Sequence, residues 1–179
     1  MTGPRQRSLP RVEAVAVSTQ EKRLTVDIGD FKVSNDPSEL IITYALGSCI
    51  AVILHDPIRH IGGMIHYMLP LSGASPERAK ERPAMFADTG VPRLFEAVYG
   101  LGAVKRDLVV KVAGGGTLHD DNGVFNIGQR NYTVLRKMLW KNSILIASED
   151  VGGRKSRTVR FWVGTGRVVI SSQLGQEEL

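Results

Sequence analysis

The sequence predicts a single-domain α+β protein, a strand-rich α/β sandwich in which two main helices pack on a mixed or antiparallel sheet. Three observations lead to this prediction. The chain has 179 residues, a length that suits one domain with one sizeable core. Short β-type runs separated by turn residues dominate the sequence. Apolar residues recur at helical spacing in two further segments, 90–100 and 128–141.

Four β-type runs in the N-terminal half predict a β meander. They cover residues 24–28, 40–46, 50–55 and 63–69. Asn35-Asp36-Pro37, Gly47-Ser48 and Asp56-Pro57 provide turns between them. We expect the folded domain to span residues 24–171. The polar segment 1–23 is then a flexible N-terminal extension, and 172–179 is a C-terminal tail.

Two helices are expected in the second half. The first covers about 90–100, with Asp88 or Thr89 as its N-cap and Pro92 in its first turn. Its apolar stripe consists of Val91, Leu94, Phe95 and Val98. The second helix covers about 128–141 and directs Val134, Leu135, Met138 and Leu139 towards the core.

The remaining strands of the second half are predicted from apolar, β-branched runs. They cover residues 107–113, 144–148, 157–163 and 167–171. Gly164-Thr165-Gly166 joins the last two as a three-residue hairpin, with glycine where a positive φ is needed.

The composition bounds the classes of function. The formal charge is +5, and residues 128–167 contain nine basic and two acidic residues. This basic region would attract a polyanion, and because no zinc-finger, helix-turn-helix or RNA-binding signature accompanies it, we expect an acidic protein partner and no nucleic acid. Charge reversal at Arg154, Lys155 and Arg157 would test whether this basic region binds an acidic protein partner. A solvated helix face and a solvated strand face explain the same charges.

The chain contains one cysteine, so an internal disulfide is impossible and a cysteine-rich metal site is excluded. There is no apolar run long enough for a membrane span or a secretory leader. We therefore expect a cytoplasmic protein that is not inserted in a membrane and uses no cofactor.

A glycine run, Gly114-Gly115-Gly116, follows a predicted strand. Its spacing matches neither a phosphate-binding loop nor a dinucleotide fingerprint, so close backbone packing is the better interpretation. His119-Asp120-Asp121 follow it, and a polar surface loop explains them better than a metal site does.

The cysteine and one histidine form a more specific pattern. Cys49 follows a Gly47-Ser48 turn, and His66 lies 17 residues later in the next strand. Adjacent antiparallel strands would place the two side by side, so that His66 converts the thiol to a thiolate and later protonates a leaving amine. The backbone N–H groups of Gly47, Ser48 and Cys49 could bind an oxyanion. A buried cysteine and a hydrogen-bonded core histidine would explain the same residues without catalysis.

The run Thr43-Tyr44-Ala45-Leu46-Gly47-Ser48-Cys49, followed by Gly62-Gly63-Met64-Ile65-His66-Tyr67, resembles the signature of the CheD family of chemoreceptor glutamine deamidases. Later blocks, including Gly114-Gly115-Gly116 and the block 125–131, are similar in order. The resemblance implies catalytic residues at Cys49, His66 and Thr43, with Thr43 orienting His66. It implies that glutamines of methyl-accepting chemotaxis receptors become glutamates through a cysteine thioester, in support of chemotactic adaptation.

The resemblance also implies binding to a CheC-type phosphatase. Two other interpretations remain. The fold could act as a non-catalytic module that binds receptors or CheC. A papain-like protease or transglutaminase would share the Cys/His chemistry, although its local signature and its distant histidine are absent here.

Overall fold

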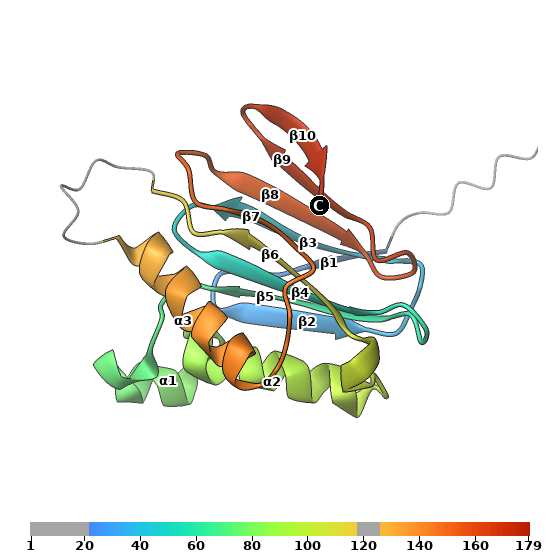
Figure 1. Cartoon of the computed structure of the whole chain (residues 1–179), viewed down its shortest axis with the longest axis horizontal. Coiled ribbons are helices and arrows are strands. Elements are labelled where there is room, and N and C mark those ends of the chain that lie inside the picture. Colours follow the sequence, from blue (N-terminus) through green and yellow to red (C-terminus); the bar gives the residue numbers. More distant parts are fainter. Residues whose placement is uncertain (1–21, 118–125) are drawn as a thin grey trace, which may run out of the picture.

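Two five-stranded sheets and a layer of helices form the computed structural model, which describes residues 22–117 and 126–179 (Figure 1). The outer sheet has the order β1-β3-β8-β9-β10 and the central sheet β2-β5-β4-β6-β7. The outer strands are β1 (Lys22–Thr25), β3 (Glu39–Leu46), β8 (Arg157–Trp162), β9 (Val168–Ser172) and β10 (Gly175–Glu178). The central strands are β2 (Asp30–Ser34), β5 (Ile61–Tyr67), β4 (Ile50–Asp56), β6 (Val109–Gly114) and β7 (Ser148–Val151).

The helices cover the face of the central sheet that is turned away from the outer sheet (Figure 1). They are α1 (Pro76–Glu81), α2 (Ala87–Gly100) and α3 (Ile127–Lys141), with short 3₁₀ turns η1 (Ser72–Ala74), η2 (Pro83–Met85) and η3 (Lys105–Asp107). None of the helices in the described ranges is long and apolar enough to cross a membrane.

The middle strands of the central sheet, β4 and β5, are buried on both faces, and this explains their continuous apolar runs. Along β4, Ile50, Val52 and Leu54 pack against the helices. Ala51 and Ile53 alternate with them and pack against the outer sheet. Two hydrophobic cores therefore sandwich β4 and β5, whose residues are all buried.

The predicted α+β class is confirmed. Both sheets are mixed, because β1 pairs with β3 and β6 with β7 in parallel while the other pairs are antiparallel. The predicted stripe of α2 is buried, as are Leu135 and Leu139 of α3. Gly166 has a φ of +72° in the hairpin between β8 and β9, as expected.

The predicted N-terminal meander was wrong, because β3 pairs with β8 in the outer sheet and not with β4. Two local predictions were also wrong. Helix α2 begins at Ala87 with Phe86 as its N-cap, and the Asp88 carboxylate instead accepts hydrogen bonds from the backbone and hydroxyl of Ser72. The predicted strand 144–148 is displaced, because Ile144 and Ile146 pack on the core as an extended segment. The strand β7 begins only at Ser148, where pairing with Lys111 of β6 becomes possible.

The sequence patterns missed three elements, β2, α1 and β10. The strand β10 lies within the predicted C-terminal tail and pairs with β9. The strand β1 begins at Lys22, two residues before the predicted start of the domain. Residues 1–21 of the predicted extension lie outside the described residues, so the domain boundaries stay a prediction.

Candidate active site

Two of the three predicted catalytic residues, Thr43 and His66, meet between the two sheets. Thr43 lies on β3 of the outer sheet and His66 on β5 of the central sheet, and both side chains are buried. In the register of β4 with β5, Ala51 lies opposite His66. Cys49 precedes Ala51 by two residues and packs against the same hydrophobic core between the sheets. Cys49 is therefore the diagonal cross-strand neighbour of His66.

A hydrogen bond from His66 to Thr43 fixes the tautomer of the imidazole. The Thr43 Oγ1 lies 2.7 Å from the carbonyl oxygen of Val26 and 2.8 Å from the Nδ1 of His66. The hydroxyl has one proton, and it must donate that proton to Val26 because a carbonyl can only accept. The Nδ1 of His66 therefore carries its hydrogen and donates it to Thr43.

The other ring nitrogen is left as a base. The Nε2 of His66 is buried and has no hydrogen-bond partner among the described residues. In this tautomer Nε2 carries a lone pair and no proton. This lone pair can accept a proton, although Nε2 forms no hydrogen bond with the half-buried Cys49 thiol in this structure.

The electrostatics favour a neutral resting pair. Burial lowers the pKa of His66 to about 4, although the nearby charge of Asp27 opposes this shift. Burial raises the pKa of Cys49, against the effect of its own backbone N–H. Both shifts favour the uncharged forms of the thiol and the imidazole, and the conversion of the thiol to a thiolate by His66 stays a prediction.

The loop of Gly47, Ser48 and Cys49 is held by all three of its carbonyl groups. The Gly47 oxygen accepts from the N–H of Gly116 at 2.8 Å and the Cys49 oxygen from the N–H of Gly115 at 2.7 Å. Asn131 Nδ2 donates to the Ser48 oxygen at 3.0 Å. The N–H groups of Gly47 and Ser48 have no acceptor within residues 22–117 and 126–179, whereas that of Cys49 interacts with its own thiol. The N–H groups of Gly47 and Ser48 could bind an oxyanion, and their substrate-binding role stays a prediction.

The glycine run packs against this loop. Gly114 and Gly115 have φ of +114° and +64°. A Cβ on Gly114 would overlap the carbonyl oxygen of Cys49, and one on Gly128 would overlap the carbonyl of Gly115. The interpretation of the run as close backbone packing is confirmed, because any side chain at Gly114 would displace the cysteine loop.

Comparisons with known proteins identify the family. The model of the CheD chemotactic sensory transduction family matches residues 68–172. The probable chemoreceptor glutamine deamidase CheD 1 of Syntrophus aciditrophicus is 52% identical over 150 residues, which cover 84% of this chain and 94% of that protein. The chain belongs to the CheD family. A probable CheD of Solibacter usitatus is 49% identical, covering 88% and 94% of the two chains. The chemoreceptor glutamine deamidase CheD of Thermotoga maritima is 36% identical, covering 86% and 94%.

Sequence reasoning missed Asn131 as a site residue of this CheD chain. It is fully buried on α3, and its Nδ2 donates to the carbonyl oxygens of Ser48 at 3.0 Å and Met68 at 2.9 Å. The amide thus joins the cysteine loop to the end of the histidine strand. The sequence signal that could have identified Asn131 is a polar residue in the apolar stripe of the predicted helix.

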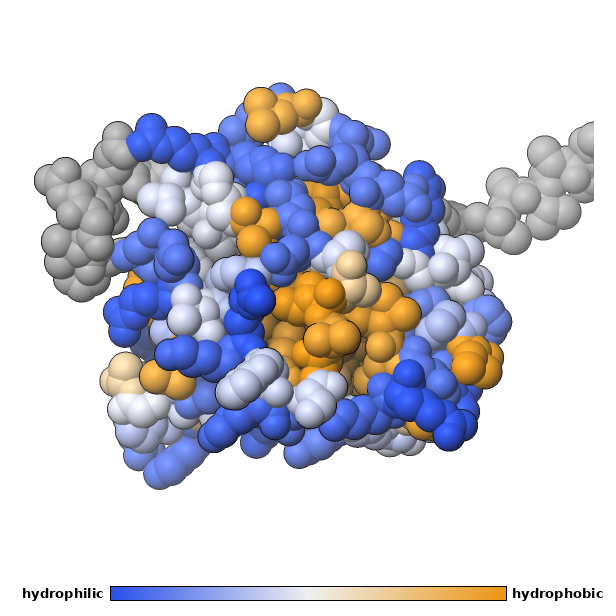
Figure 2. All heavy atoms as spheres, in the orientation of Figure 1, coloured by the Kyte–Doolittle hydropathy of each residue, from blue (hydrophilic) through white to orange (hydrophobic). Residues whose placement is uncertain are grey.

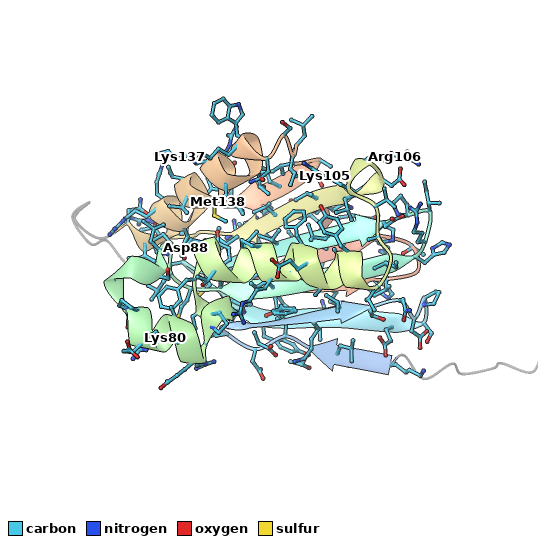
Figure 3. The ribbon with its side chains drawn as sticks, turned by 90° about the horizontal axis from the view of Figure 1, so that it is seen from below. Lys80, Asp88, Lys105, Arg106, Lys137 and Met138 are labelled. Carbon is cyan, nitrogen blue, oxygen red and sulfur yellow. The ribbon has the colours of Figure 1, made fainter. Side chains whose placement is uncertain are left out.

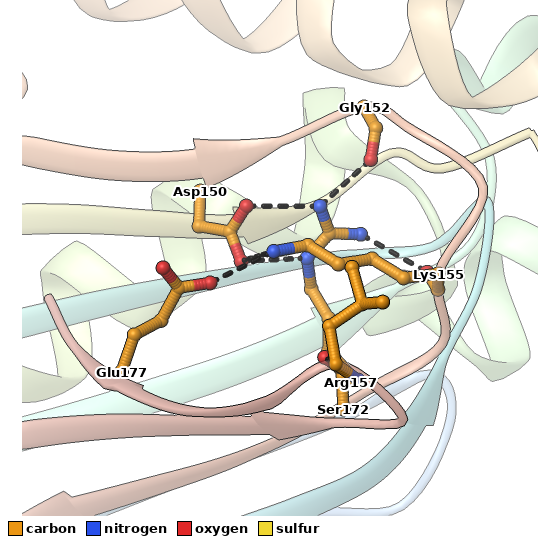
Figure 4. Close-up of polar contacts among 7 residues, drawn as sticks. Asp150, Gly152, Lys155, Arg157, Ser172 and Glu177 are labelled. Carbon is orange, nitrogen blue, oxygen red and sulfur yellow. Dashed lines mark hydrogen bonds and ion pairs between the residues drawn. The ribbon is translucent and has the colours of Figure 1, made fainter.

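The predicted basic docking face is partly wrong. Arg157 is buried and paired with Asp150, and Lys155 is paired with Asp150 and Glu177 (Figure 4). Neither side chain is free for a partner of this CheD chain, so charge reversal there would test the fold. The bases of α3 form the expected solvated face, since Arg130, Arg136, Lys137 and Lys141 are exposed.

No metal site is found in the described part of this CheD chain, where no group of three or more His, Cys, Asp or Glu could hold an ion. His119-Asp120-Asp121 lie outside the described residues. The absence of a cofactor remains an expectation from the sequence.

An Asn131→Ala variant is expected to lower kcat at least ten-fold with little change in KM, because the carbonyls of Ser48 and Met68 lose their common donor and the cysteine loop can shift. The free energy of unfolding should fall by about 1–3 kcal/mol. Steady-state kinetics well below the unfolding midpoint measure this, together with the alkylation rate of Cys49.

Asn142→Ala is the matched control, because Asn142 also donates its Nδ2 to a carbonyl of α3 but is exposed. Equal losses of kcat in the two variants would contradict a positioning role for Asn131.

Proposed function

We propose that the chain is a protein-glutamine glutaminase that converts glutamine side chains of chemotaxis receptors to glutamate, with Cys49 as nucleophile. Its relatives are named chemoreceptor glutamine deamidases. The observation that carries the proposal is the Thr43–His66 hydrogen bond, because it leaves Nε2 as an unoccupied base on the strand that pairs with the segment following the only cysteine.

Acylation begins from the neutral pair. As the Cys49 Sγ attacks the amide carbon of a glutamine, its proton passes to the Nε2 of His66. The amide oxygen becomes an oxyanion, which the free N–H groups of the cysteine loop can bind. The imidazolium then returns the proton to the nitrogen of the tetrahedral intermediate, ammonia leaves, and a thioester remains on Cys49.

Deacylation repeats these roles with water. His66 Nε2 takes a proton from a water molecule as the water oxygen attacks the thioester carbon. The C–S bond then breaks, the imidazolium returns the proton to the departing sulfur, and glutamate and the thiol are released. Thr43 is a positioning residue throughout, because it accepts from Nδ1 without supplying charge. Its uncharged hydroxyl should stabilise the imidazolium less than a carboxylate would, and this predicts a modest catalyst.

The biological role follows from the substrate. Each new receptor glutamate is a site for methylation, so the activity would support chemotactic adaptation. Binding to a CheC-type phosphatase remains part of this proposal and depends on the family resemblance alone.

Mass spectrometry of a receptor cytoplasmic fragment incubated with the protein tests the proposal. We expect glutamine-to-glutamate conversion that stops when the protein is alkylated with iodoacetamide, because one cysteine means that alkylation modifies Cys49 alone. Conversion that survives complete alkylation would contradict the cysteine mechanism. Bound but unaltered receptor would indicate a binding module, and backbone cleavage would indicate a protease.

A further inference from the structure

A hollowed apolar surface lies on the helix side of the molecule. Three adjoining hollows, with volumes of about 340, 300 and 590 Å³, surround the extended segment 143–147, and Ile144 lines all of them. Phe95 of α2 and Leu108 contribute further apolar side chains to the largest. Figure 2 shows the apolar patch in the middle of the visible face.

Two large apolar side chains on this surface are almost fully exposed. Leu145 is 88% and Trp140 is 82% exposed, and both line the hollow of about 340 Å³. Ile144 and Ile146 turn inwards and anchor the segment on the core, so Leu145 is not needed there. Single exposed apolar residues are ordinary, but several around a concave surface indicate an interaction site.

The charges around these hollows are predominantly positive. Lys105, Arg106 and Arg136 line them, against Glu149 alone. The carboxylate of Glu149 already accepts a hydrogen bond from the hydroxyl of Tyr132. Figure 3 shows Lys105 and Arg106 beyond the end of α2, next to the segment, with Lys137 on the neighbouring α3. A partner that fits this rim carries acidic side chains.

We infer that this surface, formed by Trp140, Leu145 and the hollows between them and Lys105, docks an acidic amphipathic surface of the receptor substrate. The identity of the partner depends on the proposed function, whereas the chemistry of the surface does not. None of Thr43, Cys49, His66 or Asn131 lines the hollows, so docking and catalysis use separate residues. Leu145 and Trp140 would provide the apolar contacts, and the cations would steer the approach.

Leu145→Asp is the variant that tests docking. Its side chain is exposed, so the fold should be unaffected, while a carboxylate here repels an acidic partner and removes an apolar contact. Isothermal titration with the receptor fragment should show Kd raised about ten-fold or more. Raising the ionic strength should weaken binding of the unaltered chain. The rate on a short glutamine peptide should be unchanged, because no catalytic residue lines the hollows.

Leu174→Asp is the matched control, since Leu174 is 81% exposed in the turn between β9 and β10. Its Kd should stay within two-fold of the unaltered chain. Equal Kd values for the two variants would overturn the inference, as would a self-association measured by light scattering that Leu145→Asp abolishes. Alkylated protein should still bind, so a failure of the proposed chemistry is distinguishable from a failure of docking.

Discussion

A His66→Asn variant is expected to deamidate receptor glutamines about a thousand-fold or more slowly than the unaltered chain, because it lacks a general base. The asparagine Nδ2 can still donate to Thr43 Oγ1, as Nδ1 of the histidine does. The nitrogen that is lost is Nε2, which has no hydrogen-bond partner in the described residues. The variant therefore removes the base and leaves the surrounding hydrogen bonds in place. Single-turnover rates of glutamate formation measure the loss.

The pH profile gives a second measure of His66. Only the neutral imidazole can take the thiol proton, and burial lowers the pKa of His66 to about 4. The rate of the unaltered chain should thus persist below pH 6.5 and fall only as the pH approaches 4. The unfolded chain binds a proton at His66 near pH 6.5, so stability declines between these two values by about 3 kcal/mol. An acid limb centred at pH 6.5, at a pH where the chain is folded, would contradict a buried neutral base.

The spacing of apolar residues was enough to predict the helices and strands that have one apolar face or a fully buried run. The stripe of α2 and the runs of β4 and β5 predicted their own elements, because the period of apolar residues reflects what each element buries. The strand β2, Asp30–Ser34, was missed although Phe31 and Val33 alternate with polar residues, because a run of five residues with two apolar ones is a short signal. The run 144–146 was wrongly predicted to be part of a strand, because apolar residues can pack on a core without pairing in a sheet.

Less of the active site than of the fold could be predicted from the sequence. Spacing alone predicted the antiparallel pairing of β4 with β5, which makes Cys49 a diagonal neighbour of His66, since a short turn fixes the register of adjacent strands. Thr43 entered only through family resemblance, because its contact with His66 crosses between two sheets. The carbonyl of Val26 and the amide of Asn131 could not be found in this way, since which backbone groups they meet depends on tertiary packing. The burial that lowers the His66 pKa is likewise a property of the fold.

Replacing Arg157 with methionine is expected to lower the free energy of unfolding by about 3–5 kcal/mol. The guanidinium is 1% exposed and donates to both oxygens of Asp150 at 3.0 Å, to Gly152 at 2.7 Å and to Lys155 at 3.1 Å (Figure 4). Burial alone would raise the pKa of Asp150, but the hydrogen bonds from Arg157 and Lys155 outweigh it and lower that pKa. Methionine matches the apolar stem, leaves this carboxylate with Lys155 as its remaining partner, and removes the donor of two carbonyls. Chemical denaturation measures the loss.

The matched control is Arg167→Met, which breaks the exposed pair with Glu178 and should cost less than about 1 kcal/mol. The Arg157→Met substitution should also affect the active site. Gly152 N–H donates to Gly114 and Gly153 accepts from Thr117, so the loop that Arg157 holds supports the glycine run behind Cys49. A variant that loses stability yet keeps full kcat at low temperature would show that the cysteine loop is held by Gly115, Gly116 and Asn131 without this support. A drop in kcat at temperatures where the variant is fully folded would place the Arg157–Asp150 pair among the groups that position the nucleophile.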